Sequence, residues 1–357
     1  MQIYNLEFSE AEVREAAAAG RLLSMEIECS RLCNFRCSYC YVDERGPNPD
    51  ELSLEEIQDA VLQAKALGAR KIIILGGEPS IYPQLPELLN FLAENELAIE
   101  IFTNGSGVNA ELARLLASLK ARVVLKLNSR DPELQDKLAG KKGAHAIISQ
   151  ALANLQAAGY PEKGLFLALS TVICRQNIAE LPAMWRWLRQ QGIEPYFEVI
   201  TPQANAIEND WLNVSGPELK TLFTELAAID RDSFGRMWEP QPPLVGNRCM
   251  RHQVSCLLTA TGEVMPCVGV TLAIGNIREQ KLADILRNST VLQDLKNYRQ
   301  TIKGPCKTCE KAEECYGCRG AAFQLTGDYL ASDPTCWRNC ENEVEMTSLR
   351  NKKGQKV

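Results

Sequence analysis

Short hydrophobic runs alternate with amphipathic runs from about residue 22 to residue 200. The hydrophobic runs have the length and composition of strands, whereas the runs between them carry apolar residues three and four positions apart, as helices do. This alternation predicts repeated β-α units and therefore a parallel sheet. The six expected strands cover residues 23–29, 71–75, 97–102, 122–127, 165–173 and 194–200.

The connection between the first two strands carries helix boundary signals. Ser53 followed by Glu56 is a capping box, in which each side chain bonds the backbone N–H of the other residue. Gly68 supplies the stop, because glycine adopts the left-handed conformation that ends many helices. The connection therefore predicts one helix between two parallel strands.

The first expected strand has a polar face. Ser24, Glu26, Glu28 and Ser30 alternate with apolar residues and so share one side of the strand. A closed barrel core is filled by Val, Ile and Leu, so carboxylates on a central strand predict a lumen that holds something polar. The same two-residue period adds further lumen candidates on the later strands: Glu100, Asn104, Lys126, Asn128, Tyr196 and Glu198.

The candidate catalytic residues of this lumen are Glu28, Lys126 and Glu198. The chain has only His145 and His252, so a histidine dyad is not expected and Glu, Lys or Tyr must carry any proton transfer. The alternative is structural: these side chains face solvent at the barrel edges or pair with one another.

Composition narrows the class of protein. The 357 residues are 45% hydrophobic and 24% charged, which suits one large folded domain plus a smaller one. No signal peptide and no apolar run of membrane length is present, so we expect a cytoplasmic protein without a membrane partner. The net charge of −6 gives no electrostatic reason to expect nucleic acid. Fourteen cysteines in a reducing compartment favour metal over disulfides.

Three of these cysteines directly follow the first strand. Cys33, Cys37 and Cys40 have the spacing C-x3-C-x2-C. Three thiolates can hold three corners of a [4Fe–4S] cube and leave the fourth iron open for a small molecule, whereas a relay cluster normally has four protein ligands. A zinc site and buried free thiols are the alternatives for the motif alone.

A glycine pair directly follows the second strand, at the same end of the sheet as the cysteines. In Gly76-Gly77-Glu78-Pro79 the glycines let the backbone approach a ligand, and exposed carbonyls can accept hydrogen bonds from an ammonium group. On its own, such a pair is only a turn.

Together the two motifs, with Tyr39 before the last cysteine, resemble the radical S-adenosylmethionine (radical SAM) superfamily. The resemblance implies a partial (β/α)6 TIM-type barrel in which SAM binds the open iron and is cleaved to methionine and a 5′-deoxyadenosyl radical. It also implies that Gly76, Gly77, Glu78 and Pro79 hold the SAM amino group. Weaker matches imply SAM contacts from these residues: Tyr39, Asn104, Ser129 and Asn177. For the last three, the alternative is that each side chain only caps a helix or a turn. Many family members carry Asp where this chain has Asn128.

The C-terminal third contains nine cysteines between Cys249 and Cys340. Its core, Cys306-x2-Cys309-x5-Cys315-x2-Cys318, is as compatible with zinc as with iron when taken alone. The arrangement resembles the SPASM extension of radical SAM enzymes, which binds two auxiliary [4Fe–4S] clusters. By this resemblance, auxiliary cluster I takes Cys249, Cys256, Cys267 and Cys318, and auxiliary cluster II takes Cys306, Cys309, Cys315 and Cys336.

One spacing departs from the commonest SPASM pattern. Two residues rather than three separate Cys315 from Cys318, as in enzymes of haem d1 and alternative haem biosynthesis. The runs Gly317-Cys318-Arg319 and Gly327-Asp328-Tyr329 resemble the same enzymes. Either pattern leaves the fourth ligand of cluster II open between Cys336 and Cys340. Cys29 and Cys174 remain as expected buried thiols.

The resemblance implies a radical SAM oxidoreductase with three [4Fe–4S] clusters and a flavodoxin- or ferredoxin-type reductant. Its substrate is a small molecule or a peptide. About thirty residues precede Cys33, too few for a peptide-recognition domain, which favours a small molecule or a substrate brought without a leader. The alternative is that a separate protein recognises a peptide substrate. The rival is a non-catalytic iron–sulfur electron carrier. The expected division is residues 1–21 as an N-terminal segment, 22–205 as the barrel, 206–246 as a helical linker, 247–340 as the SPASM domain and 341–357 as a polar tail.

Overall fold

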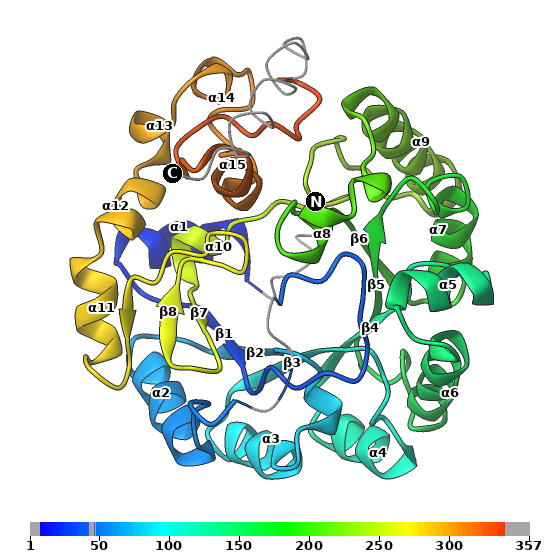
Figure 1. Cartoon of the computed structure of the whole chain (residues 1–357), viewed down its shortest axis with the longest axis horizontal. Coiled ribbons are helices and arrows are strands. Elements are labelled where there is room, and N and C mark those ends of the chain that lie inside the picture. The colour runs from blue at the N-terminus through cyan, green and yellow to red at the C-terminus, as the bar shows by residue number, and fades with distance from the viewer. Residues whose placement is uncertain (1–7, 43–45, 47, 340–357) are drawn as a thin grey trace.

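Six parallel strands form the centre of the molecule, as the alternating pattern predicts. The computed structural model describes residues 8–42, 46 and 48–339. The parallel strands are β1 (Ser24–Glu28), β2 (Lys71–Leu75), β3 (Ala98–Thr103), β4 (Arg122–Lys126), β5 (Leu167–Ile173) and β6 (Glu194–Val199). Each begins and ends within two residues of its expected bounds. The curved sheet with helices on its outer side confirms the partial barrel (Figure 1).

The helices of the barrel follow the strands in turn. They are α2 (Leu54–Ala66), α3 (Leu85–Glu94), α4 (Ala110–Ser118), α5 (Pro132–Ala139), α6 (Ala144–Ala157) and α7 (Leu181–Gln190), with the short helix η1 (Pro79–Ile81) after β2. The predicted Ser53–Glu56 capping box is present at the start of α2. Within the described residues, none of the helices is both long enough and apolar enough to cross a membrane.

The remaining helices lie before the barrel, between the barrel and the cysteine-rich part, and within the cysteine-rich part. They are α1 (Glu10–Ala18), α8 (Asn205–Glu208), η2 (Asp210–Leu212), α9 (Gly216–Phe234), α10 (Arg251–Val254), α11 (Leu282–Asn288), α12 (Thr290–Lys296), α13 (Tyr298–Thr301), α14 (Pro305–Thr308) and α15 (Arg319–Thr326). Helices α11 to α14 continue the outer ring beyond α2, and α15 lies near the open side of the barrel (Figure 1).

The cysteine-rich third continues the sheet of the barrel. Strand β7 (Leu257–Leu258) pairs with β1 in parallel, with Leu257 opposite Glu26, and β8 (Glu263–Met265) and β9 (Gly275–Asn276) follow antiparallel. The resulting order is β6-β5-β4-β3-β2-β1-β7-β8-β9. Strand β1 therefore connects the two cysteine-bearing parts of the chain.

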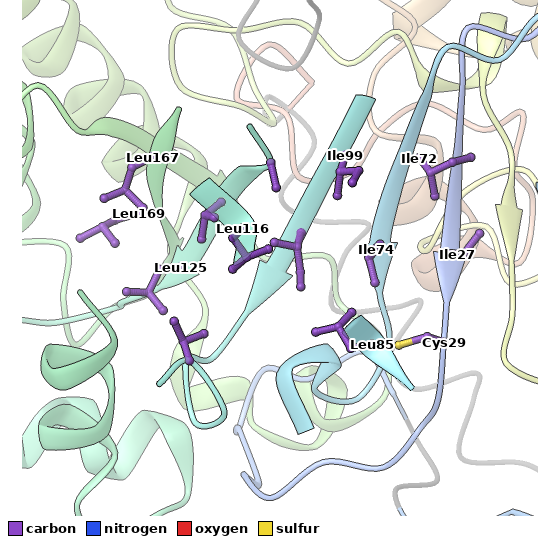
Figure 2. Close-up of a cluster of buried hydrophobic side chains, with 14 of the residues drawn as sticks. Ile27, Cys29, Ile72, Ile74, Leu85, Ile99, Leu116, Leu125, Leu167 and Leu169 are labelled. Atoms are coloured by element: carbon purple, nitrogen blue, oxygen red, sulfur yellow. The ribbon is translucent and has the colours of Figure 1, made fainter. Parts of the chain in front are cut away.

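The apolar core lies between the strands and the surrounding helices. Figure 2 shows Ile27, Ile74, Ile99 and Leu125 among the side chains that fill it. On the other face of β1, Glu26 is buried with 1% of its surface exposed, and it lines a cavity together with Ser24 and Glu100. The polar face predicted for the first strand is thus turned into the barrel lumen.

Candidate functional site

The glycine pair after β2 is shaped by the cysteine loop. The N–H of Gly77 donates to the Ser30 carbonyl at 2.8 Å, and the N–H of Glu78 donates to the Leu32 carbonyl at 2.8 Å. A Cβ at Gly76 would lie 2.4 Å from the Ser30 oxygen, and one at Gly77 would lie 2.2 Å from the Leu32 oxygen. Both positions require glycine because the backbone leading to Cys33 crosses the turn directly.

Glu78 connects the ends of β2 and β3. Its carboxylate is buried and accepts hydrogen bonds from the Ser80 N–H at 2.8 Å, from the Asn104 N–H at 2.5 Å and from the Thr103 hydroxyl. Burial raises the pKa of Glu78, and these donors oppose that effect by favouring the ionised form. Pro79 begins η1 and is buried. The Glu78 side chain therefore positions the loop after β3.

The loop carrying Cys33, Cys37 and Cys40 is held at several points. The Asn104 amide nitrogen lies 3.9 Å from the Cys33 sulfur. On the opposite side of the motif, Asn205 of α8 donates to the Cys37 carbonyl at 2.9 Å. All three cysteines are half-buried, and burial raises the pKa of the Cys37 thiol to about 12. The loop is thus fixed in place with its three cysteine residues half-buried.

Asn128 binds the aromatic residue of the cysteine motif. Its amide nitrogen donates to the Tyr39 hydroxyl at 2.5 Å, and its carbonyl side-chain oxygen accepts from the Val172 N–H at 2.8 Å. Burial raises the pKa of the Tyr39 hydroxyl well above its usual value. Because an amide can donate to a neutral hydroxyl, Asn suits this position where an Asp would have to accept from Tyr39.

Two residues predicted to contact SAM form hydrogen bonds to the protein backbone. Ser129 is fully buried, and its hydroxyl accepts from the Asp131 N–H at 3.0 Å. Asn177 is fully buried as well: its amide donates to the carbonyls of Asn128 and Val172 at 2.8 and 2.9 Å. These side chains shape the ends of β4 and β5, and their contact with SAM stays a prediction.

Two of the three candidate catalytic residues meet in the lumen. The Lys126 ammonium lies 3.8 Å from a Glu198 oxygen, 3.1 Å from the Ser170 hydroxyl and 5.0 Å from the centre of the Tyr39 ring. Burial lowers the pKa of Lys126, and the negative charge of Glu198 opposes that shift. The pair therefore lies directly beside the cysteine motif.

Glu28 has different neighbours. It is 5% exposed, its oxygen lies 4.0 Å from the Arg31 guanidinium, and it accepts a long hydrogen bond from the Ala260 N–H at 3.4 Å. Burial raises the pKa of Glu28, with Arg31 acting against the shift. Glu28 thus lies where β1 meets the segment after β7.

A second group of buried charges was only partly predicted. Arg251 of α10 places its guanidinium 3.1 Å from Glu26, and Glu100 pairs with Lys71 at 3.2 Å and with Arg122 at 2.9 Å. Lumen candidates pair with one another in the case of Lys126 and Glu198, whereas Glu100 pairs with two residues outside the predicted lumen set. Arg251 was missed because no periodicity relates it to the barrel strands.

Four of the C-terminal cysteines line one cavity, and they are the set that the SPASM resemblance assigns to auxiliary cluster II: Cys306, Cys309, Cys315 and Cys336. Several N–H groups point at their sulfur atoms. The Gly317 N–H lies 3.2 Å from the Cys315 sulfur, and the Asn339 amide lies 3.2 Å from the Cys306 sulfur. Such donors are typical around cluster thiolates. The alternative ligand Cys340 lies outside the described residues.

The other predicted auxiliary set is only partly assembled. Cys249, Cys267 and Cys318 act on one another electrostatically: burial raises the pKa of Cys267 to about 12, and Cys249 raises it further. The Tyr316 hydroxyl donates to the Cys249 sulfur at 3.3 Å. These three cysteines therefore lie near one another, and Cys249 contacts Tyr316.

Cys256 points elsewhere. Its carbonyl accepts from the Glu26 N–H at 2.9 Å in the β1–β7 ladder, where Leu257 is paired with Glu26. Successive residues of a strand face opposite sides, so Cys256 lies on the helix-facing side with Met25, and both belong to the apolar core. Burial raises its pKa to about 12, and no other cysteine contributes. The structure thus does not bring Cys256 to the other three. Cys29 and Cys174 are buried free thiols, as predicted.

Zinc sites and iron–sulfur clusters place their thiolate ligands differently. Among residues 8–42, 46 and 48–339, no three His, Cys, Asp or Glu side chains converge as ligands of one metal ion. A tetrahedral zinc site brings all its sulfur atoms to about 2.3 Å from one point. The thiolates of a [4Fe–4S] cube bind different iron atoms and need no common point.

Known proteins share both parts of the chain. Residues 27–188 match the family model of the radical SAM superfamily, and residues 249–310 match that of the SPASM iron–sulfur cluster-binding domain. The AdoMet-dependent heme synthase of Methanosarcina barkeri is 24% identical over 344 residues, covering 89% of this chain and 96% of that protein. The PqqA peptide cyclase of Streptomyces rochei is 28% identical over 351 residues, covering 89% and 90%.

The fold has counterparts among solved structures. SuiB of Streptococcus suis bound to S-adenosylmethionine superposes with a TM-score of 0.66 at 17% identity, covering 93% of this chain and 84% of that one. At this identity the likeness supports the fold alone. With the cysteine loop, the glycine turn and both family matches in place, the chain belongs to the radical SAM superfamily and carries a SPASM domain.

Proposed function

We propose that this chain is a radical SAM oxidoreductase with three [4Fe–4S] clusters, one at the loop of Cys33, Cys37 and Cys40 and two in the SPASM domain. When bound, the clusters and SAM supply a 5′-deoxyadenosyl radical that removes a hydrogen atom from substrate, and they accept the electron that remains. The observation that carries the proposal is the pairing of a three-cysteine loop, fixed by the glycine turn, with a four-cysteine cavity.

The lumen pair supplies the proton chemistry. Oxidation of a C–H bond removes a hydrogen atom, an electron and a proton, so the site needs a group that accepts the proton. Glu198 is partly exposed and lies 3.8 Å from the Lys126 ammonium, beside Tyr39 of the cysteine motif. A carboxylate paired with a buried ammonium can take up a proton and pass it on to water. Glu28, which shares one face of β1 with Glu26, is the further candidate for proton transfer.

We propose a peptide as the substrate class. The support is the PqqA peptide cyclase, which resembles this chain over 89% of its length. The two runs that resemble haem-biosynthesis enzymes, Gly317-Cys318-Arg319 and Gly327-Asp328-Tyr329, give weaker support for a haem precursor, because they contact one another. The Arg319 guanidinium donates to the Tyr329 carbonyl at 3.0 Å and to that of Ala331 at 2.6 Å. Their sequence therefore follows from the fold of the SPASM segment. A haem precursor remains the second candidate, since the Methanosarcina barkeri relative is a heme synthase.

Iron content tests the cluster assignment. The anaerobically reconstituted protein should bind about twelve irons per chain, and replacing Cys33, Cys37 and Cys40 together by Ala should lower this by about four. Elemental analysis for both iron and zinc measures the result. About four irons in the wild type, with one equivalent of zinc, would remove the SPASM cluster assignment.

Product analysis tests the reaction. With a strong reductant, the loaded protein should convert SAM slowly to methionine and 5′-deoxyadenosine, and a true substrate should accelerate this. Precursor peptides and haem precursors are then compared for acceleration, with the triple Cys→Ala variant as the control. No 5′-deoxyadenosine from a fully loaded, reduced sample would favour the electron-carrier alternative. A flavodoxin- or ferredoxin-type reductant should replace the chemical one.

A further inference from the structure

The cysteine loop packs against the C-terminal end of helix α5. The backbone N–H groups of Arg36 and Ser38 donate to the carbonyls of the last two residues of α5, each at 3.0 Å. A Cβ at Gly140, which ends the helix, would lie 2.1 Å from the Arg36 carbonyl oxygen, so this contact requires glycine. The end of α5 therefore touches the residue that precedes Cys37.

Four exposed cations surround this contact, and we name them the α5 basic surface: Arg36, Lys137, Lys141 and Lys142. The Arg36 guanidinium stays on the loop, where it donates to the carbonyls of Cys33 at 2.7 Å and of Phe35 at 2.8 Å. The Lys137 ammonium lies 5.1 Å from the centre of the Trp211 ring in η2. The surface therefore extends from the cysteine loop across the end of α5 to η2.

Carboxylates compensate this surface only in part. Within the described part of the chain, none of its four cations forms an ion pair with a carboxylate. The Asp136 carboxylate accepts from the backbone N–H groups of Gly143 at 2.5 Å and of His145 at 2.9 Å, so it is bonded to the start of α6. Glu133 in the first turn of α5 and Asp210 in η2 lie at the edges of the surface. A positive surface thus occurs on a chain whose net charge is −6.

We propose that the α5 basic surface is the docking site of an acidic one-electron carrier protein that reduces the cluster at Cys33, Cys37 and Cys40. The inference rests on the proposed function, which requires an electron at this cluster. The lumen side of the loop is the proposed place of SAM and substrate, so a carrier protein has to approach from the outer side. Opposite charges steer the association of two proteins and raise its rate by about 10- to 1,000-fold at low ionic strength. A carrier rich in carboxylates is therefore the partner that this surface fits.

The test uses reconstituted full-length protein with flavodoxin hydroquinone, an acidic carrier, as the only reductant. The surface variant replaces three exposed lysines by Glu: Lys137, Lys141 and Lys142. The control variant replaces three exposed cations on α2, on α4 and directly after α4 by Glu: Lys65, Arg114 and Lys120. Each replacement removes one positive charge and adds one negative charge, so both variants change the net charge equally.

The rate of 5′-deoxyadenosine formation at limiting flavodoxin gives the second-order rate constant of electron delivery. At low ionic strength the surface variant should lower this constant about tenfold or more, whereas the control variant should stay within about twofold of the wild type. Added salt should slow the wild type far more than the surface variant, because salt screens exposed charges. Excess dithionite should drive all three proteins equally, because a small reductant needs no docking surface. Equal flavodoxin rate constants in the two variants would overturn the proposal.

A second measurement needs neither a variant nor turnover. A carbodiimide joins carboxylates to lysines that contact them, and mass spectrometry of the product with flavodoxin should find cross-links at Lys137, Lys141 or Lys142. Cross-links confined to other lysines would contradict the proposed site.

Dithionite separates this inference from the function on which it rests. A fully loaded wild type that forms no 5′-deoxyadenosine with dithionite would remove the radical SAM proposal and the docking site together. Activity with dithionite but none with flavodoxin hydroquinone would remove the docking site alone.

Discussion

Gly77→Ala should displace the cysteine loop and selectively remove the SAM-binding cluster. The added Cβ would lie 2.2 Å from the Leu32 carbonyl oxygen and 2.4 Å from that of Arg31. The loop backbone at these two residues must therefore move by about 1 Å before the Cβ and the oxygens reach van der Waals distance. The movement weakens the hydrogen bonds Gly77 N–H to Ser30 and Glu78 N–H to Leu32, worth about 1 kcal/mol each. Overpacking adds about 1–3 kcal/mol.

The total of about 3–5 kcal/mol is concentrated next to Cys33, so the cysteine loop is displaced before the whole domain unfolds. Iron analysis of Gly77→Ala should show a loss of about four irons, and 5′-deoxyadenosine formation should fall to background, while the auxiliary-cluster signals stay. Gly46→Ala is the matched control, because a Cβ there meets no atom within 4 Å. A Gly77→Ala protein with full iron content and normal SAM cleavage would refute this account of the glycine turn.

Three further outcomes are expected. Cys256 faces the apolar core, whereas Cys249 lines the cavity that contains Glu26. Iron analysis should therefore show full iron content for the Cys256→Ala protein and a loss of iron for the Cys249→Ala protein. Equal iron losses in the two variants would show that Cys256 is a ligand. Glu28→Gln should keep cluster loading and uncoupled SAM cleavage but lower product formation by roughly a hundredfold, and normal turnover would show a structural carboxylate. Burial lowers the pKa of His252 to about 3, so the unfolded chain binds more protons than the folded chain below about pH 6.5, and the free energy of unfolding falls as the pH drops below that value. Thermal unfolding should therefore show a loss of about 1 kcal/mol in stability between pH 7.5 and pH 5.5. The His252→Phe variant should remove this pH dependence, whereas the His145→Gln variant should keep it.

The barrel was predictable because local pattern and topology agree along it. Each strand from β1 to β6 has at least five residues and carries buried apolar side chains on at least one face, and each parallel pair requires a crossover connection, which the sequence supplies. Strands β7 to β9 were not predicted, since they have only two or three residues and their position depends on pairing with β1. Such short strands form through tertiary contacts and leave no periodicity to read.

The residues of the candidate site also include some that the sequence predicts and some that it does not. Cysteine spacing and the Gly76-Gly77 pair are local signals, and they led to the family. Pairings between distant residues could not be predicted: Arg251 with Glu26, Asn128 with Tyr39, and the carboxylate of Asp333 with Cys318. Each depends on the relative placement of elements far apart in the chain, which hydrophobic pattern does not encode.

The register of β7 on β1 decides which cysteine side chains face the lumen. A one-residue slip of a strand moves every side chain to the opposite face, so it would turn Cys256 into the lumen and Leu257 out of it. The observed register is held by the bonds of Leu23 and Glu26 to the carbonyls of Val254 and Cys256, and by the burial of Leu258 in the core. The ligand set of auxiliary cluster I is therefore a question of strand register, and iron content of Cys256→Ala reports that register directly.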